Sequence, residues 1–141
     1  MTRINLLPPR ELADQHLMAE YRELPMIMGS LKRSLKSPKG LPKISTLYTL
    51  NKGHVGFFYN KGKFLHKRYL ALIVELELRG YKLSGNRQID FQVFVDNNLY
   101  LDWKPTKEEI ATNKERIDQR ISAKPLWYKH YGQPLNLITL P

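Results

Sequence analysis

The segment from Lys63 to Arg79 constrains the fold most, because it is a long apolar stretch with no internal proline or glycine. Its apolar residues recur at helical spacing and wrap around more than one face of a helix. They are Phe64, Leu65, Leu70, Leu72, Ile73, Leu76 and Leu78. The pattern predicts the central and most buried helix of the protein, with Gly80 as its C-terminal cap.

The N-terminal region predicts two more helical stretches. A stripe of apolar residues begins after Pro9 and has the period of a helix. Pro25 is expected to kink or interrupt this helix, because proline lacks the amide hydrogen that an interior helical position donates. A second helical stretch is expected from Met26 to about Leu35.

The C-terminal region predicts a further helix. Thr106 and Glu109 fit a capping box at its start, and Pro125 stops it. Three helices of useful length predict a mainly α fold, a compact single domain over residues 1–141 with long loops. Residues 90–101 are expected to form either one small hairpin or an ordered loop.

The net charge of +10 comes from one block of the chain. Residues 24–74 contain ten lysine and arginine residues and no aspartate or glutamate. Such a block is typical of a surface that binds nucleic acid or another polyanion; the alternative is a solvated basic face without a specific partner. Cysteine, a secretory signal and an apolar run of roughly 18 residues are all absent, so we expect a soluble cytoplasmic protein.

Several classes of enzyme are excluded by their missing motifs. The histidines, at positions 16, 54, 66 and 130, do not have the spacing of a metal-binding motif. The sequence also lacks the nucleophile elbow of serine hydrolases, the P-loop and the glycine motif of dinucleotide-binding folds. We therefore expect neither a metal nor a cofactor.

One group of polar residues shares a predicted helical face. His16, Glu20 and Glu23 are spaced about one turn apart, and Arg22 lies beside them. From the residues alone, Glu23 is either one half of an ion pair or a catalytic carboxylate. The aromatic and basic tail at residues 127–131 suits stacking on exposed bases, and its alternative role is a lid over the hydrophobic core.

At this point most of the chain resembles a known family, the phage endonuclease V type of pyrimidine-dimer DNA glycosylase. The stretches that carry the resemblance are Met1–Leu6, Glu11–Pro25, Gly53–Lys61, Phe64–Gly80 and Trp127–Gly132. The resemblance implies a compact, mostly α domain that binds ultraviolet-damaged duplex DNA. It also implies cleavage of the glycosyl bond of the 5′ base of a cyclobutane pyrimidine dimer, and then a nick at the abasic site.

The resemblance also implies which groups react. The nucleophile is the α-amino group of Thr2, exposed when Met1 is removed, and it forms an imine with the sugar that leads to β-elimination. An α-amine has a pKa near 7.8, so about 14% is neutral at pH 7, roughly 300-fold more than for a lysine. Glu23 is the essential carboxylate. No step requires a metal.

The DNA-binding residues that we expect combine matches to the family with basic and aromatic side chains nearby. They are Arg3, Gln15, His16, Arg22, Lys32, Arg33, Arg116, Arg120, Lys124 and Tyr128. Two positions depart from the family pattern: Met26 stands where an arginine is common, and His130 replaces a tyrosine. Two alternatives remain open, a basic DNA-binding module without chemistry and the same chemistry on another base lesion. Nothing suggests more than a monomer.

Overall fold

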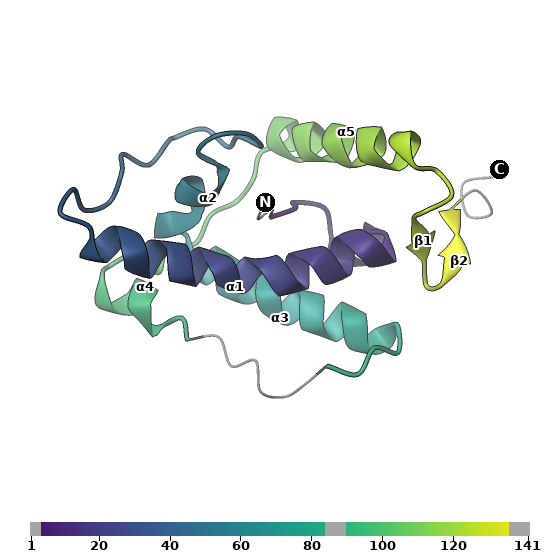
Figure 1. Ribbon diagram of the computed structural model, residues 1–141, viewed down its shortest axis with the longest axis horizontal. Helices are drawn as coiled ribbons and strands as arrows, with labels where there is room; N and C mark the ends of the chain where they lie inside the picture. The colour runs from purple at the N-terminus through teal and green to yellow at the C-terminus, as the bar shows by residue number, and fades with distance from the viewer. Residues whose placement is uncertain (1–3, 84–89, 136–141) are drawn as a thin grey trace.

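Helices make up most of the described part of this computed structural model, which comprises residues 4–83 and 90–135. The mainly α prediction is therefore confirmed (Figure 1). None of the described helices is both long enough and apolar enough to cross a membrane. The elements are α1 (Asp14–Lys36), α2 (His54–Phe57), α3 (Gly62–Leu78), α4 (Gln92–Asp96), α5 (Lys107–Ala123), β1 (Lys129–His130) and β2 (Gln133–Pro134), with 3-10 turns at Pro9–Glu11 and Phe58–Asn60.

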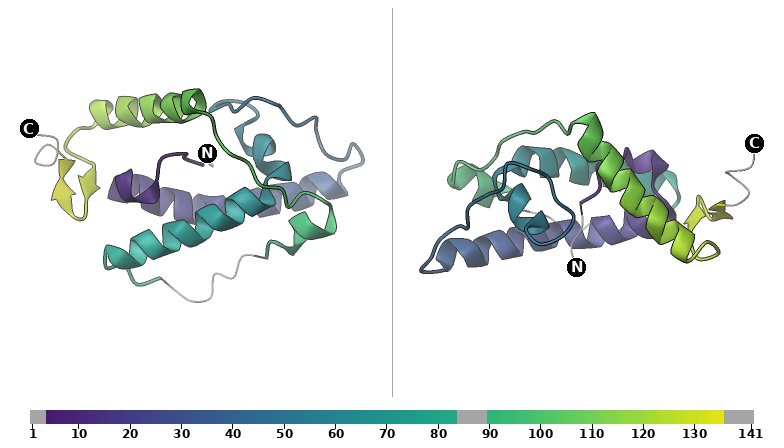
Figure 2. Two further views of the ribbon diagram at one scale, coloured as in Figure 1. Left: turned by 180° about the vertical axis from the view of Figure 1, so that it is seen from behind. Right: turned by 90° about the horizontal axis from the view of Figure 1, so that it is seen from above.

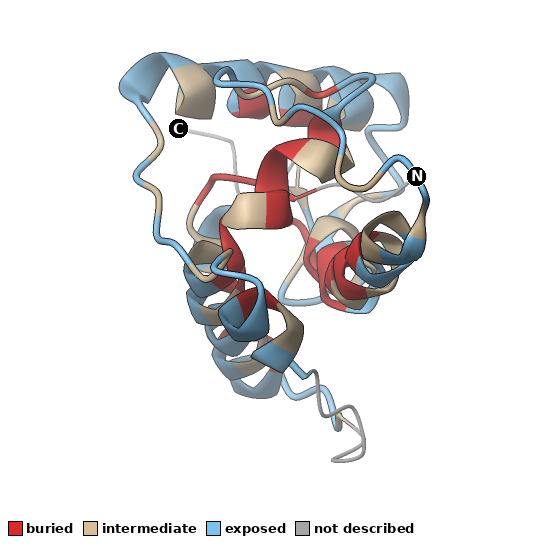
Figure 3. Ribbon diagram, turned by 90° about the vertical axis from the view of Figure 1, so that its left-hand side faces the viewer, coloured by how far each residue is buried: buried red, intermediate tan, exposed pale blue. Residues whose placement is uncertain are grey.

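The core lies where α1 packs along α3 (Figures 1 and 3). The rings of Tyr21 and Tyr69 stack across this contact, with centroids 5.5 Å apart. Burial of aliphatic side chains supplies most of the stabilisation here, at about 1.5–3 kcal/mol for each fully buried residue. Those contributed by the two helices are Leu17, Leu24, Ile27, Leu31, Leu65, Leu72 and Leu76.

The helix predicted at Lys63–Arg79 is α3, but it is not buried all round. Leu70, Val74 and Leu78 are 53%, 58% and 68% exposed, because α3 packs on α1 with one face only. The prediction of a central, most buried helix is wrong for this outer face. Gly80 adopts a left-handed conformation, with φ of 92°, directly after the helix, as its predicted capping role requires.

Of the two effects expected of Pro25, a kink or an interruption, the interruption does not occur. α1 runs without a break from Asp14 to Lys36, with Pro25 inside it. A proline in a helix interior costs about 3 kcal/mol. Burial of apolar side chains on both sides of Pro25, including Leu24 and Ile27, offsets that cost because both face the core.

The hairpin suggested at residues 90–101 is also wrong, since this segment contains the short helix α4. Phe91 and Phe94, three residues apart, are both buried, which a helical turn allows and an extended strand does not. Phe94 lies on Gly62 so closely that a Cβ at Gly62 would come within 2.4 Å of the ring. The antiparallel hairpin of the described chain is instead β1–β2, in the C-terminal tail.

α5 closes the top of the molecule and crosses α1 (Figure 2). Its predicted capping box is confirmed: Thr106 Oγ1 accepts from the Glu109 amide at 3.1 Å, and Glu109 Oε1 accepts from the Thr106 amide at 2.9 Å. The N-terminal segment at residues 4–7, the purple coil in Figure 1, runs between α1 and α5 and is buried. This arrangement brings the start of the chain, α1 and α5 to one place.

Candidate active site

A pocket of about 220 Å³ opens where α1, α5 and the N-terminal segment meet. Residues from far apart in the sequence line it, so the fold and not a local motif creates the site. The lining residues are Asn5, His16, Ala19, Glu20, Glu23, Leu50, Asn113, Arg116, Ile117, Arg120 and Tyr128.

The three residues expected on one helical face do line this pocket together. Glu20 is buried and forms an ion pair with Arg68, from its Oε2 to Nε at 2.7 Å. Glu20 is therefore one half of a buried ion pair. Glu23 lines the pocket one turn later on α1 and is only partly buried.

His16 is a neutral side chain in the pocket wall at physiological pH. Burial, and next the charge of Arg120, lower the pKa of His16 to about 4. Its ring stacks on Tyr128, with centroids 4.6 Å apart, and its two buried ring nitrogens have no hydrogen-bond partner among the described residues. His16 and Tyr128 thus present an aromatic surface with polar edges.

α5 contributes the positive charge of the pocket through Arg116 and Arg120, on successive turns. Arg116 is held loosely by Asn51, with Nη2 3.4 Å from Oδ1. These two guanidinium groups line the same pocket as Glu23 and suit an anionic ligand, since a guanidinium group can donate two parallel hydrogen bonds to a phosphate.

Gln15 and Arg22 line a separate, shallower hollow on another side of α1. The Gln15 amide is bonded to the tail at both ends. Its Nε2 donates to the Trp127 carbonyl at 2.7 Å, and its Oε1 accepts from the Lys129 amide at 3.0 Å. Trp127 is 61% exposed, so the tail tryptophan is not a lid over the core.

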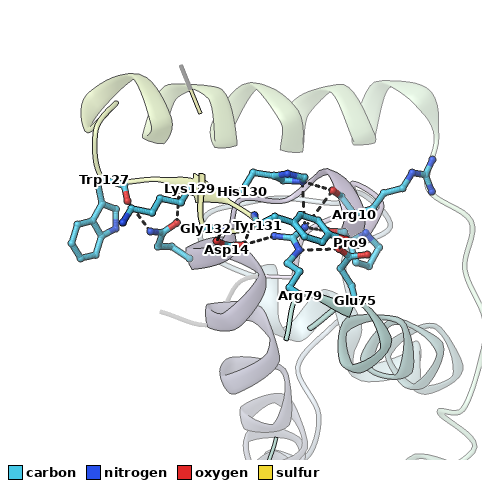
Figure 4. Close-up of polar contacts among 11 residues, drawn as sticks. Pro9, Arg10, Asp14, Glu75, Arg79, Trp127, Lys129, His130, Tyr131 and Gly132 are labelled. Carbon is cyan, nitrogen blue, oxygen red and sulfur yellow. Dashed lines mark hydrogen bonds and ion pairs between the residues drawn. The ribbon is translucent and has the colours of Figure 1, made fainter. Parts of the chain in front are cut away.

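A network of ion pairs fastens the tail to α1 and α3 (Figure 4). Arg79 bonds Asp14 and Glu75, each at 2.8 Å, and the Tyr131 hydroxyl donates to Glu75 at 2.6 Å. Asp14 also accepts from the amides of Tyr131 and Gly132. The network offsets the left-handed conformation of Tyr131, whose φ is 52°.

The remaining predicted residues lie elsewhere. Lys32 and Arg33 are exposed on the C-terminal half of α1, and Lys124 is exposed at the end of α5; none of them lines the pocket. Thr2 and Arg3 lie outside the described residues. Within the basic block, Lys61 and Arg68 are buried, so these two charges do not face a ligand.

Asn5 and Asn113 line the floor of the pocket and were not predicted. Both are buried, and Asn113 Nδ2 donates to Asn5 Oδ1 at 3.1 Å. The signal that could have revealed Asn113 is its place on the apolar stripe of α5, between Ile110 and Ile117. A polar residue on an apolar stripe must find a hydrogen-bond partner inside the protein.

Comparison with known families now identifies the chain. The family model described as pyrimidine dimer DNA glycosylase matches residues 1–88. The chain belongs to this family. The match includes Glu23 and His16, whereas Arg116 and Arg120 lie beyond its end.

A DNA glycosylase is an enzyme that cleaves the bond between a base and its sugar. The family defines the lesion as a pyrimidine dimer. Among the described residues, no group of three or more histidine, aspartate or glutamate side chains is arranged to hold a metal ion. The pocket of this glycosylase instead combines Glu23 with the two arginines of α5.

Proposed function

We propose that this glycosylase acts as a monomer on ultraviolet-damaged duplex DNA, where it cleaves the glycosyl bond of the 5′ base of a cyclobutane pyrimidine dimer and then nicks the strand. One observation carries the proposal: Glu23 shares its pocket with Arg116, Arg120 and the N-terminal segment. A carboxylate suits the positive charge that develops on the sugar, and the guanidinium groups suit the flanking phosphates.

The proposed nucleophile is the α-amine of Thr2 after removal of Met1. Thr2 precedes the buried Ile4 by two residues. Two extended residues span about 7 Å at most, so covalent geometry keeps the Thr2 nitrogen within that distance of the Ile4 nitrogen. The next residue, Asn5, lines the pocket, which supports attack from this end of the chain.

In the first step the neutral amine attacks C1′ of the damaged nucleotide. The glycosyl bond breaks, its electron pair leaves with the pyrimidine, and the pyrimidine takes up a proton. The nitrogen then loses its protons as the sugar ring opens, which yields the imine and a 4′-hydroxyl group. Glu23 stabilises the charge on the sugar and then serves in proton transfer.

In the second step the imine acidifies the C2′ proton. Removal of that proton forms a C2′–C3′ double bond and expels the 3′ phosphate with the electron pair of the C3′–O bond. Water then hydrolyses the imine and restores the amine. The overall result is cleavage of the glycosyl bond followed by a strand break, which is abasic-site lyase activity. The cleaved pyrimidine stays joined to the 3′ pyrimidine through the cyclobutane ring.

Basic side chains in and beyond the pocket would hold the DNA backbone. Arg116 and Arg120 in the pocket, and Arg22 in the neighbouring hollow, would bind phosphates near the lesion, and Lys124, Lys32 and Arg33 would extend the contact along the duplex. The exposed Trp127 and the stacked pair of His16 and Tyr128 offer aromatic surface to unstacked bases. A damaged pair stacks poorly, which lowers the cost of flipping a base out.

The test is borohydride trapping on a duplex with one cis-syn thymine dimer, with the intact mass of the protein recorded. Borohydride reduces an imine to a stable amine, so a covalent complex with protein that lacks Met1 is the expected result. Absence of that complex despite a free Thr2 amine would refute the mechanism. It would favour a DNA-binding module or another lesion, and a panel of lesions would separate these two.

A further inference from the structure

The N-terminal segment is held by side chains instead of by regular secondary structure. The Ile4 amide donates to His54 Nε2 at 2.8 Å, and the Tyr48 hydroxyl donates to the Ile4 carbonyl at 3.2 Å. Further along, the Leu6 amide donates to Asn113 Oδ1 at 2.7 Å. Three distant parts of the chain thus fix the backbone of this segment.

The tautomer of His54 suits acceptance of the Ile4 amide hydrogen at Nε2. Its Nδ1 lies 2.7 Å from the Thr49 carbonyl, which can only accept, so Nδ1 carries the hydrogen and Nε2 offers its lone pair. His54 is 2% exposed and Ile4 is fully buried. Gly53, with φ of 93°, provides the left-handed turn that brings His54 into this position at the start of α2.

The bond between Ile4 and His54 is the closest described tether to the proposed nucleophile. Reaction rates depend steeply on the position of the attacking atom, and an error of about 1 Å can cost roughly 100-fold. A free chain end two residues long would sample many positions. Fixing the Ile4 amide removes most of this freedom, because only two residues separate it from the amine.

We infer that His54 is a positioning residue for the Thr2 amine: it holds the Ile4 amide so that the amine stays in reach of the sugar C1′. The inference rests on the proposed function, since it assumes that the amine is the nucleophile. His54 itself does not line the pocket. Its loss should therefore slow formation of the imine without weakening binding of DNA.

Two substitutions separate positioning from general support of the fold. The amide of glutamine can place an acceptor where Nε2 of histidine lies, whereas the shorter asparagine reaches only the place of Nδ1. His54→Gln can keep the bond to Ile4, and His54→Asn can keep only the bond to Thr49. His66→Asn is the matched control, because His66 also bonds a side chain, Tyr100, away from the N-terminal segment.

The experiment measures the single-turnover rate of borohydride trapping with saturating enzyme on a duplex with one abasic site. The dissociation constant for a duplex with a tetrahydrofuran abasic analogue is measured beside it. His54→Asn should slow trapping by roughly 100-fold with little change in binding. His54→Gln should recover most of the rate, and His66→Asn should match the wild type.

Each result decides between the two claims. Wild-type protein that forms no imine would refute the proposed chemistry, and the inference with it. Wild-type protein that traps, with His54→Asn at the same rate, would refute the inference alone, as would equal losses in both His54 variants. If His54→Asn does not fold, Tyr48→Phe is the variant to test, because it removes the hydroxyl that donates to the Ile4 carbonyl. This variant should slow trapping about threefold, and an unchanged rate would overturn the inference.

Discussion

Arg68 holds Glu20 with two hydrogen bonds, from Nε to Oε2 at 2.7 Å and from Nη2 to Oε1 at 2.9 Å. Asn5 donates to the same Oε1 atom at 3.0 Å. The charges of the pair are almost fully removed from water. Glu20 therefore ties α1 to α3 and to the N-terminal segment, whereas Glu23, one turn later on α1, lines the pocket.

Removal of Arg68 should destabilise the protein severely, because it leaves the Glu20 carboxylate buried without a counter-charge. We expect Arg68→Met to lower the free energy of unfolding by about 3–5 kcal/mol in urea titrations. Lys67→Met is the control, since the ion pair of Lys67 with Asp102 is exposed and should contribute less than about 1 kcal/mol. Equal losses from the two substitutions would contradict this interpretation.

Glu23→Gln should abolish cleavage of the glycosyl bond and leave binding of damaged DNA largely intact. The substitution keeps the size of the side chain and removes only the charge that the transition state needs. Strand cleavage of a dimer-containing duplex after alkali, which reports the broken glycosyl bond, and the dissociation constant for the same duplex are the two measurements. Glu115→Gln, on another face of α5, should change neither, and turnover by Glu23→Gln would disprove the role of Glu23.

The buried ring of His16 should make stability depend on pH. Its pKa is about 4 in the folded protein and 6.5 in the unfolded chain, so the unfolded chain binds more protons between these values. The contribution of His16 to the free energy of unfolding is therefore fully present above pH 6.5 and is lost as the pH falls toward 4. The urea midpoint should fall more between pH 7.5 and 5 for wild type than for His16→Asn.

NMR titration of the His16 ring checks the same claim directly. The midpoint should lie near 4, and Arg120→Gln should raise it, because the charge of Arg120 is the second cause of the low pKa. A His16 midpoint near 6.5 in the folded wild type would show that the ring is hydrated.

The basic cluster on the C-terminal half of α1 should set part of the salt dependence of DNA binding. Replacing Lys32, Arg33 and Lys36 by glutamine should reduce the slope of log K against log salt by about 1 to 3 for undamaged duplex. The control replaces Lys67 and Lys114, which already pair with Asp102 and Asp118. An unchanged slope in the triple variant would show that this face does not contact DNA.

Local signals in the sequence predicted the elements whose structure is decided locally. The helix expected at Lys63–Arg79 is present as Gly62–Leu78, and the capping box at Thr106 is formed. Pro25 does not end the helix, because the packing of α1 against α3 outweighs the loss of the one backbone hydrogen bond that proline cannot donate. The hairpin expected at 90–101 failed because Phe91 and Phe94 share one buried side.

The candidate site was predictable only in part, for a physical reason. His16, Glu20 and Glu23 lie on one helix, so their spacing already places them together. Asn5 and Asn113 are separated by more than a hundred residues, and no local pattern indicates that they meet. Their pairing depends on how α5 closes over the N-terminal segment, which is a property of the assembled fold.

The bond from Leu6 to Asn113 has a consequence for synthesis, because it spans 107 residues. A ribosome adds roughly 5–20 residues each second, so the N-terminal segment waits about 5–20 s for this partner. Until α5 emerges, Ile4 and its neighbours have nothing to cover them on that side. The pocket is therefore completed last, and a nascent or truncated chain that ends before Asn113 has no closed site with which to act on DNA.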